Sequence, residues 1–169
     1  MSQTIIPAQF ERYLVDKITA GSTTDMNEFV FAHIPNLDAK SPIDRALGLP
    51  SEAYIVHRQK VDQAARLNSN TLVYSVILQS TTPSFKFNAI YLHDKHVENS
   101  CGLIVYKNTE TKEENMTTIK SVAQEYSGAA AIANIHVDPG TWQIDFYGRL
   151  MGIDDDLRLA NLDHYGLSA

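Results

Sequence analysis

The 169-residue chain is long enough for one domain with its own hydrophobic core, since single domains typically hold about 100–200 residues. Its 14 lysines and arginines stand against 20 acidic residues, a formal net charge of −6, and no basic stripe alternates with aromatic residues, which disfavours nucleic-acid binding. The single cysteine, Cys101, excludes an intrachain disulfide and a cysteine-based zinc site. No apolar run approaches the roughly 20 residues that span a bilayer, and the first residues show no secretory signal, so we expect synthesis in the cytoplasm without membrane insertion.

The first predicted element is a short amphipathic helix. Apolar side chains recur at three- and four-residue spacing, in the series Ile6, Phe10, Tyr13, Leu14 and Ile18. Pro7 suits a first helical turn, and Gly21 suits the end of the helix. Because Phe10, Leu14 and Ile18 share one face, we expect that face to pack on a sheet.

Alternating apolar and polar residues predict several strands after the helix. The first covers 28–34, and residues 36–53 lack any clear period, so we expect an irregular ordered loop there. A long strand over 55–67 and its return strand over 72–78 form a hairpin. The return strand is apolar on both faces, which predicts a place in the middle of a sheet or at a subunit contact. Further strands are expected over 85–92, 102–106 and 132–137.

The rest of the chain mixes clear and ambiguous signals. Residues 107–118 have the hydrophilic composition of a mobile surface loop, and the small apolar run 127–133 fits a strand and a helix equally well. From Trp142 to Leu150 apolar and polar side chains alternate again. This pattern predicts a half-buried strand that begins after the Pro139-Gly140 turn.

The last segment is predicted to be a helix that begins at the acidic run 154–156. Its apolar residues form two stripes, one of Ile153, Leu157 and Ala160, the other of Leu159 and Leu162. Two stripes need two surfaces, so we expect the domain to cover one and a symmetric partner the other, with these five residues as the candidate oligomer interface. The alternative is a simple helix docked on its own sheet. The chain therefore divides into a domain over 1–152 and a helix over 153–169, with an α+β fold that is predominantly antiparallel β, a sandwich-like domain with a helix at each end.

Signals for catalysis are weak. No phosphate-binding glycine loop, GxSxG elbow or HExxH motif occurs. Residue types that zinc accepts lie close together between two strands, at His93, Asp94, His96 and Cys101. The stretch is polar, so a solvated loop is the expected structure, and a metal-dependent hydrolase is the last-ranked hypothesis. His136 and Asp138 are interpreted as a polar strand end rather than a catalytic dyad. We expect no enzyme, no cofactor and no metal.

Several segments, in order along the chain, resemble the N-terminal domain of tail fibre proteins from contractile-tailed phages and phage-derived tail particles. They are Met1–Ile6, Asn27–Ala32, Leu49-Pro50, Ile55–Gln59, Val73–Val76, Glu125–Ala131, Thr141–Phe146 and Arg149–Gly152. The resemblance covers residues 1 to about 165 and implies a structural component of the virion, found in phages and prophages, whose N-terminal domain fixes the fibre to the tail baseplate. It also implies a homotrimer, baseplate proteins as partners, a possible fibre-assembly chaperone, and a C-terminal helix that leads toward a stalk. No catalytic residues carry over.

The same resemblance assigns host adhesion to the distal part of the fibre. No stalk, repeat or receptor-binding tip occurs within these 169 residues, so receptor recognition is not expected of this chain itself. The alternative hypothesis is a carbohydrate- or host-surface-binding module, in which exposed aromatic residues such as Tyr91 or Tyr106 would stack on sugars.

Overall fold

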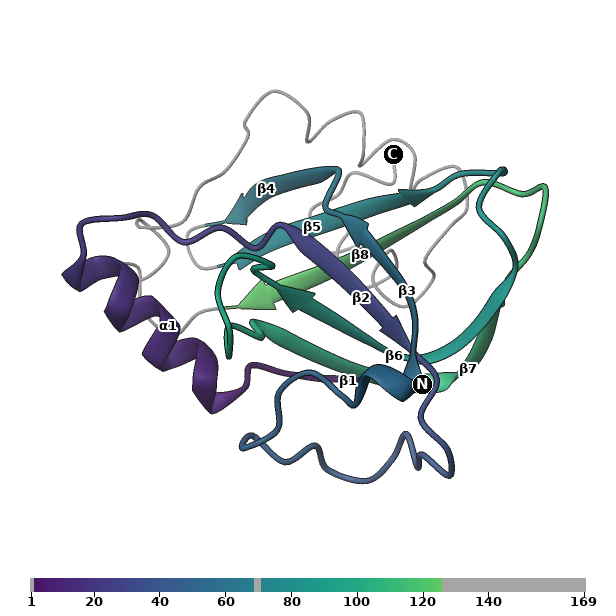
Figure 1. Ribbon diagram of the computed structural model, residues 1–169, viewed down its shortest axis with the longest axis horizontal. Helices are drawn as coiled ribbons and strands as arrows, with labels where there is room; N and C mark the ends of the chain where they lie inside the picture. The colour runs from purple at the N-terminus through teal and green to yellow at the C-terminus, as the bar shows by residue number, and fades with distance from the viewer. Residues whose placement is uncertain (1, 69–70, 126–169) are drawn as a thin grey trace.

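The computed structural model describes residues 2–68 and 71–125, which form two antiparallel sheets and one α-helix (Figure 1). The five-stranded sheet has the order β1-β7-β6-β2-β3, and the three-stranded sheet has the order β4-β5-β8. The elements are β1 Ser2–Ile5, α1 Ala8–Thr19, β2 Glu28–Ala32, the 3-10 helix η1 Glu52–Tyr54, β3 Ile55–Lys60, β4 Gln63–Asn68, β5 Thr71–Leu78, β6 Phe85–His93, β7 Leu103–Lys112 and β8 Thr118–Glu125. The predicted β-rich, antiparallel character with an N-terminal helix is confirmed.

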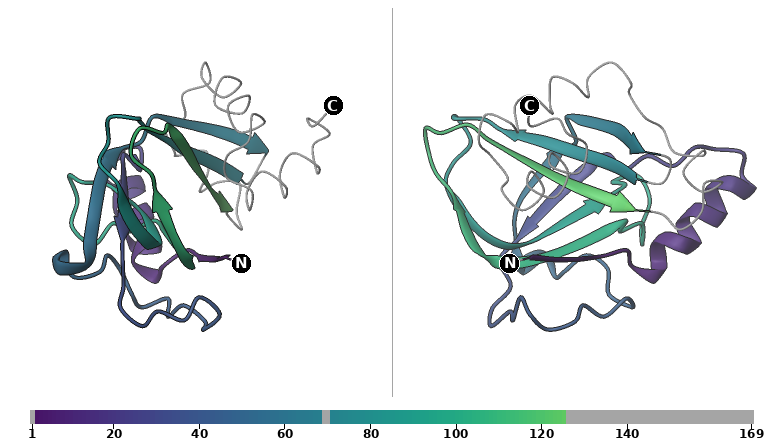
Figure 2. Two further views of the ribbon diagram at one scale, coloured as in Figure 1. Left: turned by 90° about the vertical axis from the view of Figure 1, so that its right-hand side faces the viewer. Right: turned by 180° about the vertical axis from the view of Figure 1, so that it is seen from behind.

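The main hydrophobic core draws on both sheets and on α1. Alternate residues of β2 and β5 point into it, among them Phe29, Phe31, Leu72 and Tyr74, because successive side chains of a strand face opposite ways. The ring of Phe31 meets that of Phe87 edge-on at 5.0 Å between centroids. Figure 2 shows the two sheets from the side, with α1 across one end.

Helix α1 packs through a different set of residues from the predicted one. Phe10 and Leu14 are buried as expected, but Ile18 is 51% exposed, so its assignment to the packed face was wrong. Tyr13 is buried instead, because its hydroxyl finds polar partners on the neighbouring turn. The helix begins after Pro7, and Gly21 follows it with a φ of 72°, a conformation that favours glycine. The residues before Pro7 form β1, which the pattern did not predict.

The predicted strand over 55–67 is two strands. The chain breaks at Val61 and Asp62, and β3 joins the five-stranded sheet while β4 joins the three-stranded one. The break is held by hydrogen bonds from the Val61 amide to the Asn27 carbonyl and from the Asp62 amide to the Ser75 carbonyl. The return strand, β5, is the middle strand of its sheet, as its two apolar faces predicted.

The predicted mobile loop over 107–118 is wrong for its first half, because β7 runs on to Lys112. The strand tolerates charged residues because each of these side chains has a bonding partner. Lys107 and Lys120 both bond Glu110, and Lys112 donates to the carbonyls of Gln79 and Thr82. Burial alone would raise the pKa of Glu110, but the two lysines outweigh it and hold that pKa below its usual range. β8, which the pattern missed, follows this charged stretch.

A second apolar cluster lies on the other face of the five-stranded sheet. Here the irregular loop, confirmed over most of 36–53, covers the sheet through Ile43 and Leu49. Beneath them lie Val30, Tyr91 and Ile104. Several predictions fall outside the described residues, namely the strands over 132–137 and 142–150, the C-terminal helix over 153–169, and the candidate interface of Ile153, Leu157, Leu159, Ala160 and Leu162.

Candidate functional site

The turn between β6 and β7, residues 94–100, is fixed to the rest of the domain by its first residue. The Asp94 carboxylate accepts hydrogen bonds from the Tyr13 hydroxyl at 2.7 Å, the Asn27 side-chain amide at 2.9 Å and the His96 backbone amide at 3.0 Å. Ser100 closes the other end by donating to the Asp94 carbonyl at 2.9 Å. The 94–100 turn is therefore tied both to α1 and to the segment before β2.

Burial and hydrogen bonding act in opposite directions on the acid of this turn. Burial alone would raise the pKa of Asp94, but the donors from Tyr13, Asn27 and His96, with Lys17 nearby, hold it below its usual range. Burial and the neighbouring carboxylate raise the pKa of Tyr13 well above its ordinary value. Asp94 is therefore an ionised acceptor and Tyr13 a neutral donor at physiological pH.

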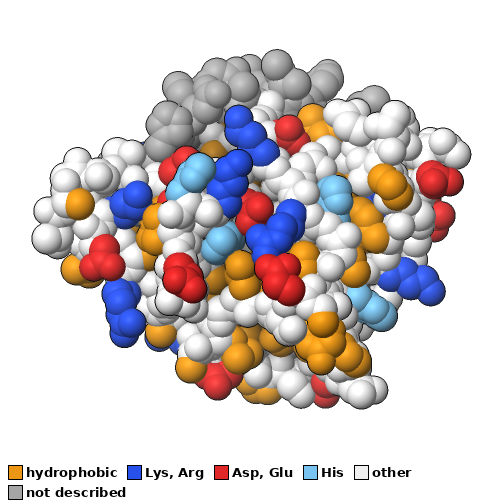
Figure 3. Space-filling view, viewed as in Figure 1, with side chains coloured by type: hydrophobic (Ala, Val, Ile, Leu, Met, Phe, Trp, Pro, Cys, Tyr) orange, Lys and Arg blue, Asp and Glu red, His pale blue; other side chains and the backbone are white. Residues whose placement is uncertain are grey.

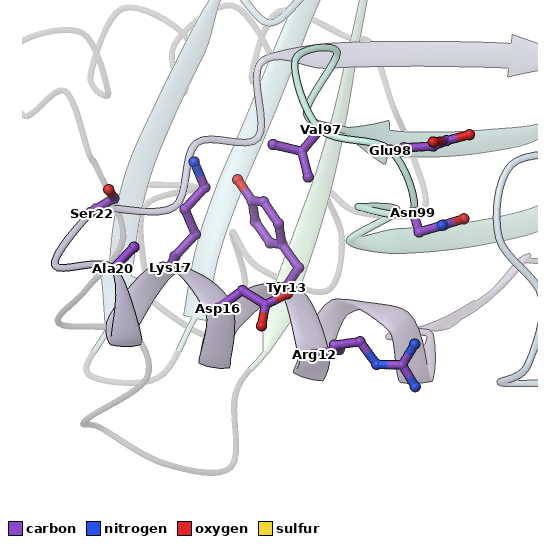
Figure 4. Close-up of a pocket in the computed structure, with 9 residues that line it drawn as sticks. All are labelled: Arg12, Tyr13, Asp16, Lys17, Ala20, Ser22, Val97, Glu98 and Asn99. Atoms are coloured by element: carbon purple, nitrogen blue, oxygen red, sulfur yellow. The ribbon is translucent and has the colours of Figure 1, made fainter.

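Two hollows flank the 94–100 turn. The first, of about 410 Å³, lies between the turn and α1 and is the helix-side hollow (Figure 4). Tyr13 and Lys17 point from the helix toward the turn, and Val97 points back toward them, whereas Arg12 and Glu98 point away.

The second, of about 530 Å³, lies on the other side of the turn and is the outer-face hollow. Its floor is the charged end of the five-stranded sheet, where Glu28 of β2 accepts from Arg58 of β3 and from the ring of His93 of β6, each at 3.0 Å. Arg58 also bonds Glu52 of η1 at 2.6 Å. Lys95, His96 and the loop at Gly48 and Leu49 form the walls. Figure 3 shows histidine, basic and acidic side chains gathered at the centre of this face.

The four zinc-accepting residue types that lie close together in the sequence, for which no metal site was expected, do not converge on one point in the structure. His93 bonds Glu28, Asp94 faces Tyr13, and Cys101 is buried in the second apolar cluster, where burial raises the pKa of its thiol to about 12. No group of three His, Cys, Asp or Glu residues in the described ranges could hold a metal ion. The expected solvated loop is confirmed at Lys95, His96, Glu98 and Asn99, which are exposed, but is wrong for Asp94, which is 3% exposed.

Tyr91 cannot stack on a sugar, as the carbohydrate-binding hypothesis proposed, because it is 1% exposed. It lies in the cluster beneath the irregular loop, with Tyr106 packed beside it and partly buried. Burial raises the pKa of both hydroxyls, which keeps them neutral. The residues His136 and Asp138 lie outside the described ranges, as does the candidate oligomer interface.

Sequence reasoning singled out His93 and His96, which line the outer-face hollow, but it missed the ion pairs beneath them. Glu28 looks like an ordinary polar strand start, yet it is 8% exposed and bonded by two neighbouring strands. A charged residue that opens an otherwise fully buried strand was the available signal, because burial of a carboxylate requires partners. Those partners, Arg58 and His93, are distant in sequence and came together only through strand pairing.

The amino-acid sequence matches a known protein family. The family model for the N-terminal region of phage tail-collar fibre proteins matches residues 1–154. The chain belongs to this family. A similar protein, named as a probable tail fiber protein of Haemophilus phage HP1 (strain HP1c1), is 38% identical over 168 residues. The match covers 96% of this chain and 18% of that protein, so the chain spans less than a fifth of its relative's length. No solved structure matches.

Membership supports a structural role for the chain in a phage tail fibre. Among the residues that the structure describes, no helix is both long and apolar enough to cross a membrane.

Proposed function

We propose that this chain is the part of a phage tail fibre that anchors the fibre to the tail baseplate. The observation that carries the proposal is the family match over residues 1–154, which takes in the whole described domain. The similar phage protein supports the same proposal, because the aligned region makes up only 18% of that protein and most of its length is left for other parts of a fibre. The partners are baseplate proteins, and the site of action is the virion.

The described domain has the properties that an anchor requires. Its two sheets share one core with α1, and the 94–100 turn is held by buried hydrogen bonds rather than left free. A rigid surface loses little conformational entropy on binding, so more of the contact energy remains as affinity. A homotrimer joined through the helix over 153–169, assembled with a fibre chaperone, completes the proposed arrangement.

The test joins residues 1–169 to an unrelated trimeric stalk and mixes the fusion with tail particles that lack fibres. We expect the fusion to sediment with the particles at a fixed stoichiometry and the stalk alone to stay in solution. A fusion that folds, as judged by circular dichroism, yet never sediments with the tails would refute baseplate anchoring. A glycan array run in parallel tests the carbohydrate-binding alternative, which predicts saturable binding to a defined sugar.

A further inference from the structure

The three-stranded sheet has a second face, turned away from the main core, which is called the far face below. Side chains alternate along a strand, so Leu72 and Tyr74 of β5 point into the main core, whereas Val73 and Ser75 point the other way. Val73 is 1% exposed, yet it belongs to neither hydrophobic cluster of the described residues. A valine loses contact with water only where other atoms cover it. The far face is therefore a packing surface, and its cover comes from outside these two clusters.

Small side chains form the centre of the far face. Paired residues of neighbouring strands share a face of the sheet. Two adjacent rows across β4, β5 and β8 make up this centre: Ala65, Val73 and Ala123, then Gln63, Ser75 and Ser121. Layers pack best when small side chains on one lie against large ones on the other. The far face therefore fits a segment that presents bulky apolar side chains.

A polar atom of the far face lacks a donor. The hydroxyls of Ser75 and Ser121 bond each other at 2.8 Å. The Oε1 atom of Gln63, in the same row, is buried and accepts no hydrogen bond from any residue in the part of the chain that the structure describes. A buried oxygen without a donor lowers stability, so a covering segment that brings an N–H or O–H group to this point is favoured.

The chain continues from this sheet into a segment that has both properties. The described chain leaves the sheet at Glu125, at the end of the edge strand β8. The connection 126–141 is long enough to cross the sheet, since an extended chain spans about 3.3–3.6 Å per residue. After it, Trp142, Ile144 and Phe146 alternate with polar residues and share one face of the predicted strand. The indole of Trp142 also carries an N–H donor, which needs a partner when buried.

We propose that Trp142, Ile144 and Phe146 pack on the far face of the three-stranded sheet, with the Trp142 indole beside Gln63. The run 127–133 is nearer in sequence, but its small side chains would leave empty space above a floor that is equally small. With this packing, the sheet is covered on both faces, and the residues that follow are joined to the domain by a packed segment rather than a free linker. The inference does not depend on the baseplate-anchoring function.

The first test uses the whole chain, in which Trp142 is the only tryptophan. Acrylamide should quench its fluorescence several-fold less than in the urea-unfolded chain, and equal quenching would overturn the proposal. In the isotopically labelled chain, we expect nuclear Overhauser contacts from the indole ring to the methyl groups of Val73 and Ala123. Contacts from the ring to a different surface would contradict the proposal. So would contacts to those methyl groups from Leu157, which would make the C-terminal helix the cover.

Two valines of β5 provide a matched control. Val73 lies on the far face and Val76 points into the main core, and both are buried. Side chains in contact have coupled effects on stability, whereas separated ones have additive effects. Trp142→Ala with Val73→Ala should therefore shift the urea midpoint, followed by circular dichroism, by less than the sum of the single shifts. Trp142→Ala with Val76→Ala should shift it by the full sum. Additivity in both pairs would overturn the proposal, and the contacts in the parent chain decide the question if a variant does not fold.

Discussion

The hydrogen bond between Tyr13 and Asp94 joins α1 to the 94–100 turn, and its removal has a calculable cost. The bond is 2.7 Å long and buried, and a hydrogen bond to a charged group contributes about 1.5–3 kcal/mol to stability. Tyr13→Phe also removes the hydroxyl that accepts a hydrogen bond from the Asp25 backbone amide, at 3.1 Å. That amide is only partly buried, so a water molecule can accept its hydrogen bond instead. We therefore expect Tyr13→Phe to lower the free energy of unfolding by about 2–3 kcal/mol.

A double-mutant cycle isolates the bond itself. Tyr13→Phe, Asp94→Asn and the double variant are unfolded in urea, and the coupling energy is obtained from the three changes in stability. Since the two side chains are in direct contact, we expect a coupling of about 1–2 kcal/mol. Strict additivity of the two single changes would show that the contact adds nothing to stability and would refute the reasoning.

The same carboxylate gives the domain an acid-sensitive stability. Burial would raise the pKa of Asp94, yet its hydrogen-bond donors lower it below the usual range. At an acidic pH between the two pKa values, the Asp94 carboxyl is therefore still ionised in the native state but already protonated in the unfolded chain. This contribution is fully present above the unfolded pKa of about 3.9 and is lost as the pH falls through the lower native value. Stability measured from pH 6 to pH 2 should fall less steeply in Asp94→Asn than in the parent, and parallel curves would contradict the assignment.

The remaining predictions concern the core, metal and assembly. In urea unfolding, Phe10→Ala should lower the free energy of unfolding by about 3–5 kcal/mol, because the ring is 1% exposed. Ile18→Ala should lower it by less than about 1 kcal/mol, because that side chain is 51% exposed. Equal losses for the two variants would contradict the packing of α1. A chelator should leave the melting temperature unchanged, since no three His, Cys, Asp or Glu residues of the described ranges are grouped so as to hold a metal ion. A stoichiometric metal found by elemental analysis would overturn this. Leu157→Asp with Leu159→Asp in the trimeric fusion should weaken tail attachment, and equal attachment would exclude the C-terminal helix from assembly.

The sequence predicted elements well where periodicity alone decides structure. The strands around Phe31, Tyr74 and Ile90 alternate or are apolar throughout, and each lies where the pattern placed it. Errors arose where polar residues are satisfied by distant partners. Lys112 lies in a strand despite its hydrophilic neighbours, because the carbonyls of Gln79 and Thr82 accept from its ammonium group.

The candidate site could not be predicted for a related reason. Asp94 looked like one of several polar residues in a surface stretch, because its partner Tyr13 lies 81 residues away and was assigned to an apolar helix face. The pairing of Glu28 with Arg58 and His93 likewise depends on strand order and register, which hydrophobic periodicity does not specify. A buried acid is recognisable only once its donors are in place.

The bonds that stabilise this domain also determine what it presents to a partner. Asp94 accepts from α1, from the segment before β2 and from the turn itself, so the orientation of Lys95 and His96 is set by the fold of the core. A free loop would lose conformational entropy on docking, at about 1–2 kcal/mol for each residue whose backbone is fixed. Here that ordering has already taken place during folding, so the 94–100 turn holds its exposed side chains in a preset geometry. A partner that binds this turn would therefore lose less free energy to the ordering of the backbone than one that binds a free loop.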